Sequence, residues 1–296
     1  MTSNLDALLT ALYVEIDDHV VPARRGRGRR PRLTDAELLT LAVAQVLLGV
    51  DGEHRWIRFA YCRLGHLFPY LPKQPGYHKR LVAAAPLLAA AITHLATVSP
   101  SWCDDLPLVD ATPVPCGTSR ETVKRSDLAG LAGYGYCAAH SRFYWGLKLY
   151  LLAAPDGMPI VWCLADPKIG EREVCLDLLT IAVETGRLAA GTTVLADKGL
   201  AGRDMERRIA ALGVSLLRPD RRDEQARHGS LGGARQWIES VFDTLKGQLG
   251  LERHGGRTSQ GVGTRIAQRL LALAAAIWHN WATDAPNKRS LTAYDH

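Results

Sequence analysis

Apolar residues within the first hundred positions recur at helical spacing. Thr34 and Glu37 have the spacing of a capping box, in which each side chain bonds the other residue's backbone amide, and a periodic apolar stretch follows them as far as Gly49. A further helix is expected from about Lys79 to Ala96, kinked or broken at Pro86 because proline lacks a backbone donor. These patterns predict a small helical domain over residues 1–100.

After Pro100 the pattern changes to short apolar runs that alternate with helical periodicity. Strands are expected at 107–110, 143–153, 159–164, 192–196 and 214–217, the second and third joined as a hairpin by a turn at 155–157. Helices are expected at 173–188, at 203–212 and from about Arg235 to Leu245. This order is that of the ribonuclease-H-like fold, an α/β fold whose mixed sheet carries helices on both faces. We expect that fold over residues 101–296.

The overall composition is that of an ordinary globular protein. Of the 296 residues, 47% are hydrophobic and 22% charged, which excludes a wholly disordered or collagen-like chain. The longest apolar stretches, 81–96 and 270–282, are shorter than the roughly 18 residues of a membrane span. No charged-then-apolar leader follows Met1, so we expect a cytoplasmic protein without a membrane partner. The six cysteines form no CxxC pair, which favours reduced thiols over a zinc site.

Positive charge is concentrated near the N-terminus. The chain has 36 basic and 30 acidic residues, a net charge of +6, and residues 24–32 alone hold six arginines without an acid. This segment is either a flexible phosphate-binding arm or a solvated linker, and the pattern alone favours neither. Further basic stretches at 218–227 and 246–269 favour a nucleic-acid partner over a membrane surface. The arm's arginines are Arg24, Arg25, Arg27, Arg29, Arg30 and Arg32.

Three acids fall where the expected fold brings its elements together. Asp110 closes the first strand, Asp197 follows the fourth, and Glu239 lies on the last helix. Converging carboxylates would bind magnesium, which prefers hard oxygen ligands. Any one of them alone is more often a helix cap or a surface charge, and Asp166 and Glu171 are competitors of lower rank.

The helix around Glu239 strengthens this hypothesis. Arg235 lies four residues before Glu239 and Lys246 seven after it, so a regular helix presents all three on one face. A carboxylate between two cations suits a site where DNA phosphates meet a metal. The alternative is an ordinary surface helix with ion pairs.

Several motifs together resemble a known family. In combination they resemble bacterial insertion-sequence transposases with a DDE domain, nearest the insertion-sequence 982 family, over Leu33 to about Asn280. The motifs are Leu108-Val109-Asp110 with Pro113 and Cys116, Tyr144 to Leu149, Leu195-Ala196-Asp197-Lys198-Gly199, Arg235 to Glu239 with Phe242, Leu245 and Lys246, and Leu251-Glu252-Arg253 with Arg257.

The resemblance implies a function and a set of site residues. It implies that Asp110, Asp197 and Glu239 bind two magnesium ions, for which manganese can substitute. It also implies that these ions serve the cleavage and strand transfer of DNA. The substrates would be double-stranded DNA of the element's terminal inverted repeats and of the target, bound by a homodimer or larger assembly at the bacterial nucleoid. Arg235, Lys246 and Lys198 would contact DNA.

Two positions depart from the family pattern, and two other functions stay open. Gly232 stands where relatives have a tyrosine, and Tyr150 where they commonly have a histidine. The alternatives are a ribonuclease-H-like nuclease without strand transfer and a domesticated transposase-derived DNA-binding protein. The intact acidic trio argues against the second.

Overall fold

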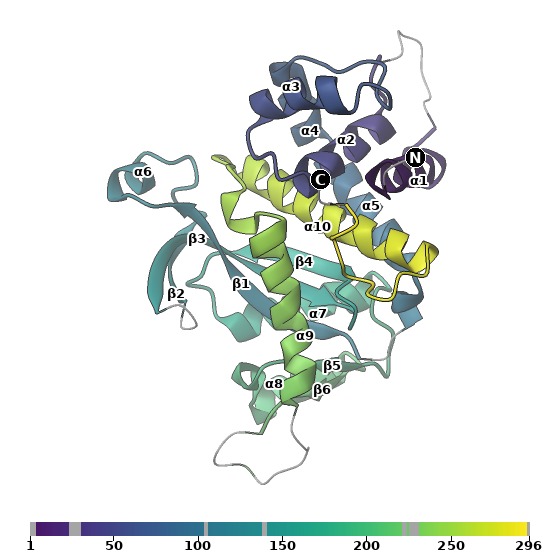
Figure 1. Ribbon diagram of the computed structural model, residues 1–296. Coiled ribbons are helices and arrows are strands. Elements are labelled where there is room, and N and C mark those ends of the chain that lie inside the picture. The colour runs from purple at the N-terminus through teal and green to yellow at the C-terminus, as the bar shows by residue number, and fades with distance from the viewer. Residues whose placement is uncertain are drawn as a thin grey trace. The chain divides into compact units, whose positions relative to one another are not determined.

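The computed structural model describes residues 4–23, 31–103, 106–137, 141–220, 224 and 231–294. The chain forms two compact units, each drawn in Figure 1. The helical unit comprises Met1–Ser99, Leu245–Gly256 and Gln260–His296, and the sheet unit comprises Pro100–Thr244 with Arg257–Ser259. The sequence-based division at residue 100 keeps residues 101–296 together, whereas the structure groups most of the C-terminal 52 residues with the first 99.

The helical unit is built around its last helix. Its first five helices are α1 (Asn4–His19), α2 (Asp35–Leu47), α3 (Glu53–Arg63), α4 (Gln74–Ala83) and α5 (Ala85–Thr97). The short turn η5 (Leu251–Arg253) and the helix α10 (Ser259–Ala282) complete it. Every residue of α10 from Ile266 to Ile277 is buried, and a helix buried on all sides is a core helix.

The two helix-terminus predictions in this unit are confirmed. The Glu37 amide donates to Thr34 Oγ1 at 3.1 Å and the Thr34 amide donates to Glu37 Oε2 at 2.5 Å, which is the expected capping box. Pro86 lies in the first turn of α5, and α4 and α5 meet at a bend of 61°.

Among the described residues no single helix is long and apolar enough to cross a membrane. The bent pair α4 and α5 has the length and composition of a span only when the two helices are taken together.

Buried polar side chains tie α10 to the earlier helices. Arg265 forms an ion pair with Glu53, and the two side chains are 12% and 8% exposed, respectively. Glu53 also accepts hydrogen bonds from Gln74 at 2.7 Å and contacts His78 at 2.9 Å. Gln268 Nε2 donates to the Ala42 carbonyl at 2.8 Å. The contacts of Arg265 and Gln268 fix the rotation of α10 against α3 and α2, because each satisfies a polar group removed from water.

The described residues of the sheet unit form a sheet of six strands. They are β1 (Leu108–Gly117), β2 (Gly133–Cys137), β3 (Arg142–Ala153), β4 (Pro159–Ala165), β5 (Thr193–Leu195) and β6 (Ser215–Leu217). The order is β2-β3-β1-β5-β6, with β4 also paired to β3. β1 is antiparallel to β3 and parallel to β5, and β6 is parallel to β5. This mixed sheet confirms the ribonuclease-H-like fold, and the sequence patterns had not predicted β2.

Four α-helices of the described chain belong to this unit. They are α6 (Arg120–Lys124), α7 (Glu171–Glu184), α8 (Arg203–Ala211) and α9 (Gly232–Asp243). α7 packs on β3 and β4, α8 on β6, and α9 on β1. Figure 1 shows α9 crossing in front of the sheet. The helix is held there by Ile238, Val241 and Phe242, which are buried.

We expect the Glu53–Arg265 pair to be a main determinant of stability in the helical unit. Arg265→Met removes the guanidinium from the buried Glu53 carboxylate, and breaking a buried pair in this way costs about 3–5 kcal/mol. Urea unfolding followed by far-ultraviolet circular dichroism measures the loss. The control is Lys124→Met, which breaks an exposed pair with Glu121 and should change stability by less than about 1 kcal/mol. Equal, small effects of both variants would contradict this account.

Candidate active site

The parallel pairing of β1 and β5 brings Asp110 and Asp197 to matching positions. Leu108 of β1 lies in register with Leu195 of β5, and each aspartate follows its leucine by two residues. Side chains two residues apart in extended chain point to the same face. The two carboxylates therefore belong to the same face of the sheet, on neighbouring segments.

Asp110 does not close its strand, and this part of the prediction is wrong. β1 continues to Gly117, with Asp110 opposite Leu151 of β3. The β1–β5 pairing is formed only at Leu108, so Asp110 lies where β1 extends past β5. Pro113 and Pro115 lie in this stretch, where proline is tolerated because the strand has lost a neighbour.

Each aspartate is held by a local backbone hydrogen bond. Asp110 Oδ1 accepts from the Ala111 amide at 2.7 Å, and Asp197 Oδ1 accepts from the Lys198 amide at 2.7 Å. Asp197 thereby caps the 3-10 turn η3 (Lys198–Leu200). Both side chains are half-buried, and Lys198 is exposed. The bonds orient the carboxylates at the edge where β5 ends.

An arginine that the sequence patterns did not single out braces this turn. Arg172, in the first turn of α7, donates from Nε to the Gly199 carbonyl at 2.9 Å and from a terminal guanidinium nitrogen to the Ala201 carbonyl at 2.8 Å. No motif spacing identifies such a contact, because Arg172 lies more than twenty residues before the turn in the sequence. It bonds only backbone atoms of the turn in these contacts, so it is a positioning residue.

Glu239 lies on α9, which packs on β1. It is exposed, while its neighbours Ile238 and Val241 are buried, so the helix has the expected apolar face. The side chain of Arg235 and the surroundings of Gly232 lie outside the described part of the chain. The predicted shared face with Lys246 assumed a regular helix, but α9 ends at Asp243 and a π-helical turn, Thr244–Gln248, carries Lys246 in the helical unit. The regular helix on which that prediction depended therefore does not extend to Lys246.

The donor chemistry of Asp110 and Asp197 fits a hard divalent cation. Both supply carboxylate oxygens, the ligands magnesium prefers. Within the described ranges, however, no group of three His, Cys, Asp or Glu side chains is gathered closely enough to hold a metal. The structure thus brings two of the three expected acids to one face by register, without a closed ligand group that includes Glu239.

The two competing acids have other partners. Asp166 accepts a hydrogen bond from the Lys168 amide at 2.9 Å in the turn after β4. Glu171 forms an ion pair with Lys148 at 3.1 Å.

Burial raises the pKa of the Cys175 thiol on α7, and the carboxylates of Glu171 and Asp110 raise it further, so this thiol stays protonated.

Comparison with known proteins decides the family. A family profile described as the transposase DDE domain matches residues 101–275, more than half of the chain. The chain belongs to the DDE transposase family. A search among curated proteins gave no match.

Family membership confirms the broad predictions from the sequence. The protein is a transposase of a family of DNA-binding polynucleotidyl transferases and nucleases that use divalent metal ions. The profile does not resolve the narrower insertion-sequence 982 group, which stays a prediction. The roles of the individual site residues of this transposase likewise stay predictions.

Arg172 offers a test of how the Asp197 turn is held. Arg172→Met removes both hydrogen-bond donors and keeps an unbranched side chain. A hydrogen bond from a charged group contributes about 1.5–3 kcal/mol. We therefore expect hydrogen exchange of the backbone amides at residues 198–201 to become about tenfold faster or more. Hydrogen-exchange mass spectrometry measures the rates. Arg207→Met, which removes an exposed pair with Asp204, is the control. Identical exchange in wild type and Arg172→Met would show that the turn needs no brace.

Proposed function

We propose that this transposase cuts DNA at the terminal inverted repeats of its own insertion sequence and joins the freed ends to target DNA. The observation that carries the proposal is the register of β1 and β5, which brings Asp110 and Asp197 to one face of a ribonuclease-H-like sheet. The family supports phosphodiester chemistry on DNA.

Asp110, Asp197 and Glu239 are the proposed ligands of two magnesium ions, for which manganese can substitute. When bound, such ions activate the attacking water or 3′-hydroxyl and stabilise the leaving oxygen. The chain's own part is to present fixed carboxylates: the Ala111 and Lys198 amides orient Asp110 and Asp197. Glu239 would supply the third carboxylate from α9, which packs on β1.

The proposed DNA contacts come from cations outside the acidic pair. Lys198 follows Asp197 directly and is exposed, so it can meet a phosphate beside the reacting one. Arg235 and Lys246 are assigned the same role on the strength of the family resemblance. Pairing two element ends calls for a homodimer or a larger assembly on DNA.

The arginine arm at 24–32 is the proposed nonspecific DNA tether. Residues 24–30 lie outside the described part of the chain, which includes Arg32. The guanidinium of Arg32 lies 4.0 Å from the centroid of the Tyr70 ring, a cation–π contact that anchors the end of the arm to the helical unit.

Replacing either aspartate tests the proposed chemistry. Asp110→Asn and Asp197→Asn keep side-chain shape but remove a metal-binding charge, so we expect magnesium-dependent cleavage of oligonucleotides bearing the element ends to fall by at least about a thousandfold, a loss of about 4 kcal/mol in barrier lowering. Gel assays of cleaved and joined products measure it, with DNA binding retained.

Asp204→Asn is the matched control, because Asp204 is an exposed acid on α8. It should cleave like the wild type. Wild-type cleavage by Asp110→Asn or Asp197→Asn would overturn the assignment. Cleavage without any joined product in the wild type would instead favour a ribonuclease-H-like nuclease. DNA binding without cleavage in the wild type would favour a domesticated DNA-binding protein.

The salt dependence of binding tests the arm. Arg24, Arg25, Arg27, Arg29 and Arg30 are changed to serine, while Arg32 is kept because it contacts Tyr70. If the arm binds phosphates, the slope of log affinity against log salt should become shallower by up to about 4.5, since each phosphate contact contributes about 0.9. Cleavage on saturating DNA should be unchanged. An unaltered slope would identify the segment as a solvated linker.

A further inference from the structure

The hairpin of β2 and β3 carries exposed aromatic rings on one face. Tyr134 and Tyr136 are each 52% exposed, and Phe143 is 78% exposed. Tyr136 lies directly opposite Phe143, and their ring centroids are 4.9 Å apart. Tyr134 is two residues from Tyr136, so it points to the same face. Large apolar rings exposed side by side mark an interaction surface.

The alternation of glycine and tyrosine in β2 shows that this face is the outer one. Gly133 and Gly135 point to the opposite face, where an added Cβ would meet Asp166 at 2.1 Å and the Tyr144 ring at 2.6 Å. That face is therefore closed by the sheet unit's own side chains, which leave room only for glycine. The rings on the other face are not needed for this packing.

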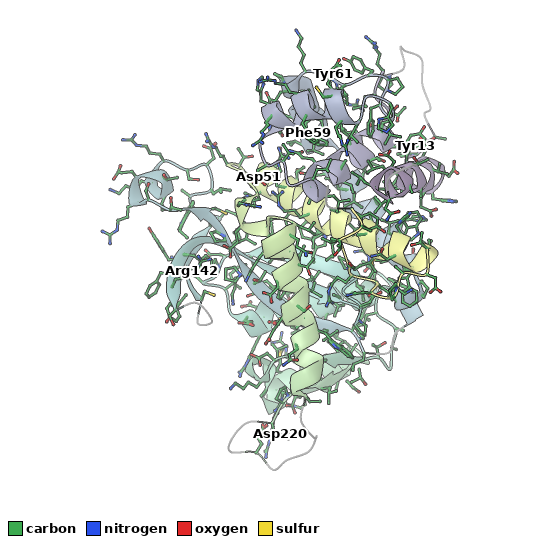
Figure 2. All side chains as sticks on the ribbon, in the orientation of Figure 1. Tyr13, Asp51, Phe59, Tyr61, Arg142 and Asp220 are labelled. Carbon is green, nitrogen blue, oxygen red and sulfur yellow. The ribbon has the colours of Figure 1, made fainter. Side chains whose placement is uncertain are left out.

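Charge near the rings favours a nucleic-acid strand over a second protein. Residues 117–145 contain four basic and two acidic side chains, a net charge of +2. Arg120, Lys124 and Arg125 lie on or directly after α6 and are exposed. Trp145, opposite Tyr134, is buried, and a Cβ added at Gly117 would meet both Trp145 and Thr122 of α6. The helix α6 therefore borders the ring-bearing face. Arg142 begins β3 next to Phe143 (Figure 2), but side chains alternate along a strand, so it belongs to the opposite face and the cations of α6 are the ones that border the rings.

We propose that this ring-bearing face, Tyr134, Tyr136 and Phe143, binds unpaired DNA bases by stacking. Every base presents a flat π face, so exposed rings bind single strands without reading sequence, while neighbouring cations hold the phosphates. The ligand class is a single-stranded DNA segment, such as one that is exposed when strands separate around a cut. The role in transposition rests on the proposed function, whereas the binding itself does not.

Fluorescence anisotropy with a labelled oligothymidine single strand tests the proposal. Tyr136→Ala and Phe143→Ala should each weaken binding about tenfold, the size expected for losing one stacked base. The conservative Tyr136→Phe and Phe143→Tyr keep the rings and should bind within about twofold of wild type. Tyr61→Ala removes an exposed tyrosine of the helical unit and is the matched control, expected to bind like the wild type.

A second probe separates bases from phosphates. An abasic strand of the same length keeps the phosphates but has no bases. It should bind the wild type weakly, and its affinity for each alanine variant should equal its affinity for the wild type. Alanine variants that bind oligothymidine like the wild type would overturn the proposal, as would equal losses on the abasic strand. So would a wild-type dimer in sedimentation that the alanine variants convert to monomer, because the face would then bind a second copy. Cleavage assays play no part, so failure here leaves the proposed chemistry untouched.

Discussion

The short parallel contact between β1 and β5 is the constraint on which the proposed site depends. β5 has three residues and pairs with β1 at Leu108 and with β6 along its length. Because side chains alternate along extended chain, this one register decides that Asp110 and Asp197 share a face. A shift of one residue would turn one of them to the opposite face. The turn after β5 is then fixed by the Asp197 cap and by Arg172.

Much of the sheet unit follows from local sequence patterns. β3 and β4 are long apolar runs separated by a turn, and the structure places them within about one residue of the predicted bounds. β1 was predicted to end at Asp110, where its apolar run ends, whereas the strand continues through Pro113 and Pro115 to Gly117. These prolines are tolerated because β1 has passed the end of β5 there, a fact of tertiary structure that no local pattern contains. β2 was missed because its alternating glycines contribute no apolar signal, and their reason is the packing of Asp166 and Tyr144.

Long-range packing explains the rest of what the sequence did not reveal. The helix α10 was not predicted: its apolar stretch at 270–282 was noted only as too short for a membrane span, and a local pattern does not say which unit such a helix enters. That choice depends on polar partners more than 200 residues away, Arg265 with Glu53 and Gln268 with the Ala42 carbonyl. At the candidate site, the order of the strands was enough to select Asp110 and Asp197 as the leading acids. The contact of Arg172 with the turn after Asp197 and the π turn at Lys246 could not be predicted, because they depend on tertiary structure.

Manganese binding in a double-mutant cycle tests the central claim, that Asp110 and Asp197 act on one ion from neighbouring segments. Electron paramagnetic resonance counts the free Mn²⁺ in titrations of wild type, Asp110→Asn, Asp197→Asn and the double variant. If the two carboxylates share an ion, each single variant loses its binding and the double variant loses little more, because coupled residues are not additive. Wild-type binding in both single variants, or fully additive losses, would contradict the account.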